Sequence, residues 1–207
     1  TYGVDDARVV ADETLDYLEH DRSHPAGGYT EAVCGDGSLA DRARRQNPHM
    51  HLFEALLALY DATGEDRCLE RAAHLFDLVC TRFMVDGTLR EYFTEDLEPA
   101  PGQKGRIVEP GHHMEWVWLL HRYARLSGDR SAVQTAEALY AFALANGYDI
   151  RSGGVIDEVT DGGQAIKESR RLWPQTEALK GHVARYRHTG DASTLVRVEK
   201  GVALLIQ

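Results

Sequence analysis

The chain has 207 residues, of which 43% are hydrophobic and 27% are charged. This length and composition fit one large globular domain with a substantial core. The formal net charge of −10 comes from 23 basic and 33 acidic residues, which argues against a concentrated cationic face for a nucleic acid. No apolar stretch approaches the roughly 20 residues that cross a bilayer, so we expect no membrane partner.

The first predicted element is a helix over about residues 6–20, followed at 27–38 by a glycine-rich segment typical of a short hairpin. Further along, three similar turns recur at Gly64, Gly128 and Gly190. In each turn an aromatic residue precedes the glycine, and an aspartate close behind it opens a new helical pattern. This chemistry is typical of a tight helix–helix turn, and its regular recurrence predicts a repeated helix–turn–helix unit.

The helices on either side of these turns differ in character. Residues 52–60, 116–124 and 178–186, before the turns, are largely apolar all round, whereas the segments after the turns are apolar on one side only. A helix that is apolar all round is buried, and a one-sided helix faces water. We therefore predict inner and outer helices. An ordinary helical bundle with coincidental turns remains the alternative.

Segments rich in glycine and β-forming residues lie between the helical units. Residues 87–102 and 153–163 predict short hairpins, and 27–38 has the same character. All three precede an inner helix, so the hairpins are expected to gather at one end of the helices. Functional residues are frequent in such connecting segments. The predicted fold class is therefore all-α, with short β-hairpins at the active-site end.

An ionisable side chain recurs near the start of each inner helix. Thirteen residues before the three turn glycines stand His51, Glu115 and Glu177. His112 lies three residues before Glu115 and shares its helix face. If the inner helices run parallel around an axis, these side chains converge at one mouth. Aromatic residues nearby strengthen the case for a ligand site, namely Trp116, Trp118 and Trp173.

Other interpretations of the same residues stay open. A glutamate in a first helical turn complements the helix dipole, and His51 alone could be a core histidine. The segments 49–54 and 112–115 contain metal-ligand types, but His49 and His51 point to different sides of a helix and the second segment offers two ligands. We therefore expect no metal and no other cofactor. A metal-dependent site remains the weaker alternative.

General acid–base chemistry by histidine is the favoured interpretation. The ordinary histidine pKa of about 6.5 suits proton transfer near neutral pH. A carboxylate one turn away can orient the imidazole and stabilise its protonated form. Tryptophan faces commonly receive the C–H faces of sugar rings, which points to a carbohydrate ligand.

Three segments resemble the N-acylglucosamine 2-epimerase family, which includes mannose isomerase, sulfoquinovose isomerase and cellobiose 2-epimerase. They are NPHMHLFEALLALYDATGE (47–65), EPGHHMEWVWLL (109–120) and RRLWPQTEAL (170–179). The resemblance runs in order through nearly the whole chain. It implies an (α/α)6 barrel of paired inner and outer helices. It also implies proton transfer at sugar C2 by histidine acid–base catalysts, without a required metal.

The resemblance assigns roles to particular residues. It implies that His112 is a catalytic acid/base, that Glu115 is its supporting carboxylate, and that His51 contacts the sugar or assists ring opening. His113 matches a variable family position and is expected to be structural. The sugar-binding candidates are Trp116, Arg171, Trp173, Gln175 and Glu177.

The chain is shorter than the family pattern. We count about seven helices, whereas a six-unit barrel needs twelve, and family members are roughly twice this length. The family's second catalytic histidine is expected beyond Gln207, and an N-terminal pocket arginine has no counterpart here. Residues 1–207 are therefore predicted to form a single partial barrel domain, about half to two-thirds of an (α/α)6 barrel. Such a portion would leave apolar faces of the inner helices uncovered, at about 25 cal/mol per Å².

The predicted function is that of a sugar isomerase or epimerase. It would interconvert a mannose-type or N-acylglucosamine-type aldose with its ketose or C2 epimer, although these residues alone could be inactive. A non-catalytic sugar-binding or protein-interaction module is the alternative. The expected partner is the monosaccharide substrate, and a homodimer stays open.

Cysteine usage bears on the compartment. Cys34, Cys68 and Cys80 are an odd number without metal-site spacing, and the last two lie in a helical pattern, so we expect buried free thiols. Free thiols favour a reducing environment, and the prediction is a cytoplasmic protein. No signal peptide is recognisable, although the chain begins at Thr1 without a methionine.

Overall fold

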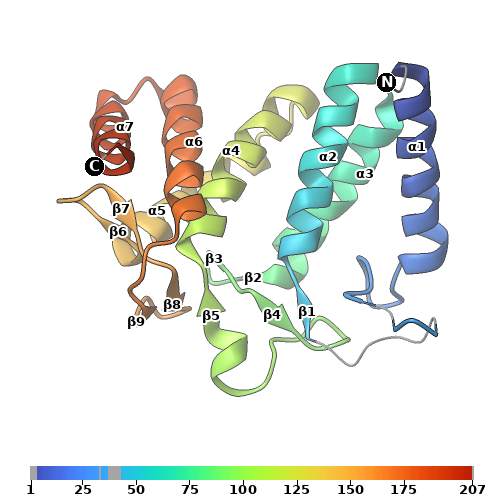
Figure 1. Cartoon of the computed structure of the whole chain (residues 1–207), viewed down its shortest axis with the longest axis horizontal. Helices are drawn as coiled ribbons and strands as arrows, with labels where there is room; N and C mark the ends of the chain where they lie inside the picture. The colour runs from blue at the N-terminus through green and yellow to red at the C-terminus, as the bar shows by residue number, and fades with distance from the viewer. Residues whose placement is uncertain (1–3, 33, 37–42, 207) are drawn as a thin grey trace.

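The computed structural model describes residues 4–32, 34–36 and 43–206. Within these ranges the fold is dominated by seven α-helices, a leading helix followed by three pairs (Figure 1). Their bounds are α1 Val4–Tyr17, α2 Asn47–Thr63, α3 Asp66–Leu78, α4 Pro110–Ser127, α5 Ser131–Asn146, α6 Leu172–Thr189 and α7 Ala192–Leu205. The predicted first helix is present, but it starts at Val4 and continues beyond Tyr17 as a π-helical turn, η1 Leu18–Arg22.

The three predicted turns are confirmed. Gly64, Gly128 and Gly190 have φ of 69°, 78° and 71°, the left-handed conformation that favours glycine. Each glycine donates its backbone N–H to a carbonyl in the last turn of the helix that it ends. The repeated unit is therefore an inner helix, a tight turn and an outer helix.

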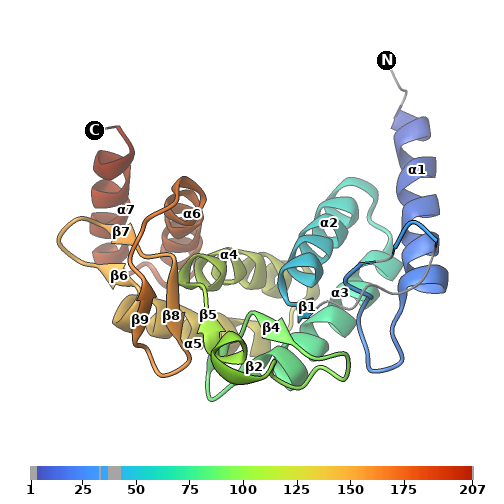
Figure 2. The ribbon, with the colours of Figure 1, turned by 60° about the horizontal axis from the view of Figure 1, so that its bottom comes forward.

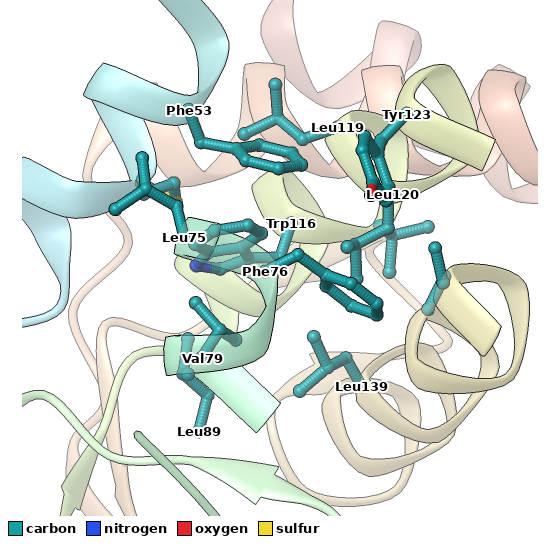
Figure 3. Close-up of a cluster of buried hydrophobic side chains, with 14 of the residues drawn as sticks. Phe53, Leu75, Phe76, Val79, Leu89, Trp116, Leu119, Leu120, Tyr123 and Leu139 are labelled. Carbon is teal, nitrogen blue, oxygen red and sulfur yellow. The ribbon is translucent and has the colours of Figure 1, made fainter. Parts of the chain in front are cut away.

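The helix pairs follow one another along an arc, which is open in Figure 2 between α1 and α7. α4 packs against α2, α5 and α6, so it lies at the centre of the arc. Figure 3 shows the core between these elements, where Phe53 of α2 meets Trp116 and Tyr123 of α4. The outer helix α3 buries one stripe of side chains, Cys68, Ala72, Leu75 and Phe76. The predicted burial on several sides is confirmed for the inner helix α4 and the one-sided burial for the outer helix α3, whereas the inner helices α2 and α6 keep exposed faces.

Short strands gather on one side of the molecule, at the end of the helices from which the inner helices start (Figure 1). β2 pairs with β3 and β6 with β7 as tight hairpins, while β8 pairs with both β5 and β9, and β1 pairs with β4. All of these pairs are antiparallel. The bounds are β1 Arg44–Arg45, β2 Met84–Val85, β3 Thr88–Leu89, β4 Tyr92–Phe93, β5 Ile107–Val108, β6 Tyr148–Asp149, β7 Gly154–Val155, β8 Glu158–Thr160 and β9 Ala165–Lys167. Two short helical turns complete the chain, the π-helical η2 Val79–Phe83 and the 3₁₀ turn η3 Gly102–Arg106.

The segment 27–38 and the cysteines differ in part from the sequence predictions. In the segment 27–38, where a short hairpin was predicted, Tyr29 forms an isolated antiparallel bridge with Ser23, which precedes the segment. Residues 33, 37 and 38 lie outside the described residues. Cys68 is buried as predicted, but Cys80 is exposed, so the prediction of two buried thiols was wrong. Cys80 lies in η2, which continues an outer helix, and it is on the side of that helix turned to solvent.

Apolar surface is uncovered on the terminal helices and on the inner helices α4 and α6, as expected for part of a barrel. Exposed large apolar side chains lie mainly on α1 and α7, including Val9, Val10, Val196 and Val202. α4 and α6 also border a second cavity of about 620 Å³, whose lining combines apolar side chains with cationic ones: Trp118, Leu179, Val183, Ala184, Arg122, Arg125, Lys180 and Arg187. None of the described helices is both long and apolar enough to cross a bilayer.

Candidate active site

A cavity of about 430 Å³ lies where the inner helices begin and the strands gather. Each of the three inner helices contributes to it, and so do the segments that precede them. The lining residues are Arg45, Asn47, His51, Glu91, Tyr92, Glu109, His112, Glu115, Arg171, Trp173 and Glu177. His51, Glu115 and Glu177 therefore meet in one cavity, as their equivalent positions along the repeat predicted.

The starts of α4 and α6 approach each other closely at Gly111. A Cβ atom at this position would lie 2.8 Å from Cβ of Pro174 and 3.0 Å from the ring of Trp173. Only a residue without a side chain allows this approach. As a result the Trp173 ring lies over the imidazole of His112, with 4.8 Å between their centroids.

The His112 ring lies between a carboxylate and an amide. Nδ1 of His112 is 3.0 Å from Oε1 of Glu91, and Nε2 is 3.0 Å from Nδ2 of Asn47. Burial lowers the pKa of His112, but the charge of Glu91 and, to a smaller extent, those of Glu109 and Glu115 outweigh it and leave the pKa raised. The imidazole is thus held ready to take up a proton.

The sequence interpretation missed Glu91, whose carboxylate lies beside His112. It is 3% exposed and lies between β3 and β4. Burial raises the pKa of Glu91, but the contacts with His112 and Gln46 prevail and the net pKa is lowered, so the carboxyl is ionised. The alternation of buried Leu89, Glu91 and Phe93 was the available signal, since an acid on the buried face of a strand requires a partner.

Trp116 does not line the cavity, so the structure does not support its predicted role in contacting the sugar. The side chain is fully buried against Phe53, and its Nε1 donates a 2.9 Å hydrogen bond to Oε1 of Gln46. Gln46 in turn donates from Nε2 to Oε2 of Glu91 at 3.0 Å. Trp116 faces away from the cavity because it is one residue beyond Glu115 on α4 and points to a different side of the helix.

His113 occupies a structural position, as predicted. The ring is fully buried, and its Nε2 accepts a 3.2 Å hydrogen bond from the backbone N–H of Leu89 and lies 3.0 Å from the hydroxyl of Thr88. Burial lowers its pKa to about 4, so the imidazole is neutral. His113 therefore fastens β3 to α4.

Glu115 was expected to support His112, but in the structure its carboxylate contacts His51. Its Oε1 is 3.7 Å from Nδ1 of His51, while the carboxylate beside Nδ1 of His112 is that of Glu91. Burial and the neighbouring charge of Glu177 raise the pKa of Glu115 to about 7. Glu177 accepts a 2.9 Å hydrogen bond from Nε1 of Trp118. This side of the cavity can hold a carboxylic acid that is protonated near neutral pH.

The remaining predicted contacts divide into two groups. Arg171 borders the cavity, where it pairs with Glu109 at 2.7 Å and with Asp157 at 3.1 Å. Gln175 is buried outside the lining, and its amide bonds the backbone N–H and C=O of Val155, each at 2.8 Å. Gln175 therefore holds β7 against α6, and its predicted contact with the sugar is not supported.

Two groups of side chains have the spacing of a metal site. Among the described residues, the ligand atoms of His51, Glu54 and Glu115 lie within 4.8 Å of one another, as do those of a second group, Glu91, Glu109 and His112. In the second group the carboxylates are already engaged, because Arg171 binds Glu109 and Gln46 binds Glu91. This donor set is better suited to proton transfer than to an ion.

The fold and the site together describe part of an α/α barrel with a histidine–carboxylate cluster in the cavity where its inner helices begin. The sequence profile described as N-acylglucosamine 2-epimerase (GlcNAc 2-epimerase) matches residues 1–206. The chain belongs to the N-acylglucosamine 2-epimerase family.

Similar proteins of known sequence or structure agree with this assignment. The chain is 38% identical over 177 residues to a mannose-6-phosphate isomerase of Rhizobium meliloti (strain 1021), covering 84% of this chain and 44% of that protein. It is 26% identical over 202 residues to a D-mannose isomerase of Marinomonas mediterranea, and the match covers 91% of this chain and 51% of that protein. A crystal structure of D-mannose isomerase superposes with a TM-score of 0.88 at 24% identity, over 98% of this chain and 53% of that chain.

These matches bear on the fold and on the extent of the chain. The likeness to the solved structure confirms the predicted (α/α)6 barrel architecture, of which this chain forms a part. The chain spans about half the length of the curated relatives that it matches.

Proposed function

We propose that these residues carry one side of the active site of a sugar isomerase or 2-epimerase. The observation that carries the proposal is the placement of His112, which lines the cavity with its Nδ1 beside ionised Glu91 and its Nε2 beside Asn47, another lining residue. A base held in this way can accept a proton from a carbon acid. Membership of a family whose relatives are named as isomerases and epimerases supports the proposal over a non-catalytic module.

The proposed step is the removal of the proton at sugar C2. Nε2 of His112 accepts the C2 proton of the open-chain aldehyde, the electron pair of the broken C–H bond forms the C1–C2 double bond, and the C1=O pair moves to O1. This gives an enolate or, once O1 is protonated, an enediol. Return of a proton to C1, with loss of the O2 proton to form the C2 carbonyl, completes an isomerisation; return to the opposite face of C2, with the C1 carbonyl restored, completes an epimerisation. The positive charge that develops on His112 is stabilised by Glu91.

The cavity suits a monosaccharide. Its lining is predominantly polar, with carboxylates and arginines that can bond sugar hydroxyls, and Trp173 offers an aromatic surface for a ring face. His51 is half exposed and sits beside Glu115, so it is the candidate for a hydroxyl or ring-oxygen contact. The names of the relatives favour mannose and mannose 6-phosphate as the first substrates to test.

Proton exchange in D₂O tests this proposal directly. The 207-residue chain, alone and within its longer parent protein if it has one, is incubated with mannose, mannose 6-phosphate and N-acetylglucosamine. Deuterium at C1 indicates an isomerase, and deuterium at C2 indicates an epimerase. The matched control is His112→Gln, which should show no exchange. Sugar binding by calorimetry without any deuterium incorporation would overturn the proposal and support the non-catalytic module.

A further inference from the structure

A buried chain of polar contacts leads from the core to His112. It begins at the indole N–H of Trp116, passes through the amide of Gln46 and ends at the carboxylate of Glu91 beside the imidazole. Trp116 and Gln46 are fully buried, and Glu91 and His112 are 3% and 7% exposed. Three elements that are distant in sequence supply these groups, so the arrangement is a product of the fold.

The direction of each hydrogen bond follows from the first member. An indole N–H can only donate, so it fixes the side-chain oxygen of Gln46 toward Trp116. The NH₂ of Gln46 must then face Glu91 and can only donate, so Oε2 of Glu91 accepts. The reversed amide would place two donors together at one end and two acceptors together at the other. Oε1 of Glu91 is thereby left to face Nδ1 of His112.

The contact on the other side of the imidazole agrees with this direction. Nδ2 of Asn47 lies 3.0 Å from Nε2 of His112, which fits a donor–acceptor pair when the ring proton is on Nδ1. In that tautomer the Nδ1 proton is on the side of Glu91, although Nδ1 and Oε1, 3.0 Å apart, do not complete a hydrogen bond in the structure. Backbone hydrogen bonds reinforce the geometry, since the N–H of Gln46 donates to the carbonyl of Glu91.

We propose that Trp116 is a positioning residue that acts through Gln46 and Glu91 to keep His112 in the Nδ1–H tautomer, with the lone pair on Nε2, the nitrogen that accepts the sugar proton. The inference deepens the proposed function, because it explains how a base that borders the cavity is kept in its reactive form. It also gives the buried tryptophan of the EPGHHMEW segment a role other than sugar contact. Its central measurement needs no sugar, so the inference and the proposed function are tested separately.

The substitution Glu91→Gln gives the sharpest test. Gln46 still points a donor at position 91, so the introduced amide must accept there with its oxygen and present its NH₂ to Nδ1 of His112. The imidazole is then forced into the Nε2–H tautomer. Nitrogen-15 NMR at alkaline pH distinguishes the two tautomers, and the variant His112→Gln identifies the His112 signal. We expect Nδ1–H in the wild type and Nε2–H in Glu91→Gln, with sugar proton exchange slowed by about 100-fold to 10,000-fold.

A second substitution tests the part played by the tryptophan. Trp116→Phe removes the fixed donor, so Gln46 can reverse and the introduced amide can reverse with it. The double variant Glu91→Gln/Trp116→Phe should therefore regain part of the Nδ1–H tautomer and roughly tenfold of the lost exchange rate. Phe53→Leu combined with Glu91→Gln is the control, because it disturbs the same core contact without removing an N–H. If Trp116→Phe does not fold, Gln46→Met also removes the fixed donor, and the same recovery is expected.

Three kinds of outcome test the positioning role of Trp116 separately from the proposed function. An Nδ1–H tautomer in Glu91→Gln, or an unchanged Nε2–H tautomer after removal of the tryptophan donor, would overturn the positioning role. Equal recovery in the Phe53 control would also overturn it, since packing alone would then explain the effect. Correct tautomers without deuterium incorporation in any sugar would leave the positioning role intact and overturn the proposed function.

Discussion

His112 and His113 are consecutive in the chain, yet their rings lie in opposite electrostatic environments. His112 is beside ionised Glu91, and its pKa is raised despite burial. His113 is fully buried between β3 and α4, and burial lowers its pKa to about 4. One helix turn thus presents a histidine of raised pKa to the cavity and a neutral histidine to the core.

Exchanging each histidine for glutamine should separate these roles. His112→Gln should abolish sugar proton exchange while the fold is retained, because the ring makes no core contact that the amide cannot replace. His113→Gln should keep exchange within a few-fold but reduce the free energy of unfolding by about 1–3 kcal/mol, because buried groups lose partners. Deuterium incorporation and urea unfolding measure the two effects. Turnover near the wild-type level in His112→Gln would contradict the assignment.

The pH dependence of exchange should follow the His112 pKa. The neutral ring is the base, so the rate should rise with pH and level off above a pKa that lies higher than the ordinary 6.5. Because the folded pKa is raised, the stability that His112 contributes is complete below pH 6.5 and is lost as pH rises through the folded pKa. A rate profile with its midpoint below 6.5 would be inconsistent with this arrangement. Glu91→Gln should move the midpoint to lower pH.

Glu115 should make stability fall toward alkaline pH. Its pKa is raised from 4.5 to about 7, first by burial and then by Glu177, so the folded state favours the protonated acid. The resulting stability is complete below pH 4.5 and is lost as pH rises to 7, at a cost on the order of 2–3 kcal/mol.

The variant Glu115→Gln carries no charge at any pH and should escape this loss. It should therefore unfold at a higher urea concentration than the wild type at alkaline pH, and at a similar one in acid. Glu54→Gln is the matched control, because Glu54 is more exposed and contacts the same histidine. An equal gain in both variants would show that burial of Glu115 is not the cause.

Gly111→Ala should disturb the sugar site through Trp173. The added methyl group would lie within 3.0 Å of the indole ring and of Pro174, so the ring has to move. We expect weaker sugar binding, seen as a higher KM or calorimetric Kd, and a loss of about 1–3 kcal/mol in unfolding free energy from overpacking. Gly128→Ala is the comparison, since its Cβ would meet nothing within 4 Å. It should lower stability through backbone strain without affecting sugar binding.

Chelation should leave exchange unchanged. The carboxylates nearest His112 are engaged by Arg171 and Gln46, so proton transfer needs no ion to organise them. The measurement is deuterium incorporation before and after treatment with EDTA, followed by addition of Mg²⁺, Mn²⁺ or Zn²⁺. A loss with EDTA that one of these ions restores would favour the metal-dependent alternative.

The parts of this site that the sequence predicted are those governed by helix periodicity. His51, Glu115 and Glu177 stand at the same number of residues before the three turn glycines, and this equivalence predicted that they lie in one cavity. Glu91 was missed because it lies between two-residue strands. The helical periodicity does not extend to this segment, and the strands' pairing partners can be distant in sequence.

Errors arose where the direction of a side chain mattered more than its position along the chain. Trp116 and Gln175 lie in the expected segments near the cavity, but each belongs to a hydrogen-bonded contact on the far side of its helix. Cys80 similarly follows a helix with a buried stripe and yet faces solvent. Such choices depend on which neighbouring element supplies a partner, and this is decided only by the packed fold.

The three turn glycines have a consequence for rebuilding the molecule. Gly64, Gly128 and Gly190 have open space around their Cα atoms, and each ends an inner helix whose first turn borders the cavity. An inner helix of 17 or 18 residues is about 25 Å long, so each turn is remote from the chemistry. Affinity peptides, fluorophores or new chain termini could be introduced at these turns, and helix pairs could be exchanged between relatives there, while the cavity residues at the other end keep their geometry.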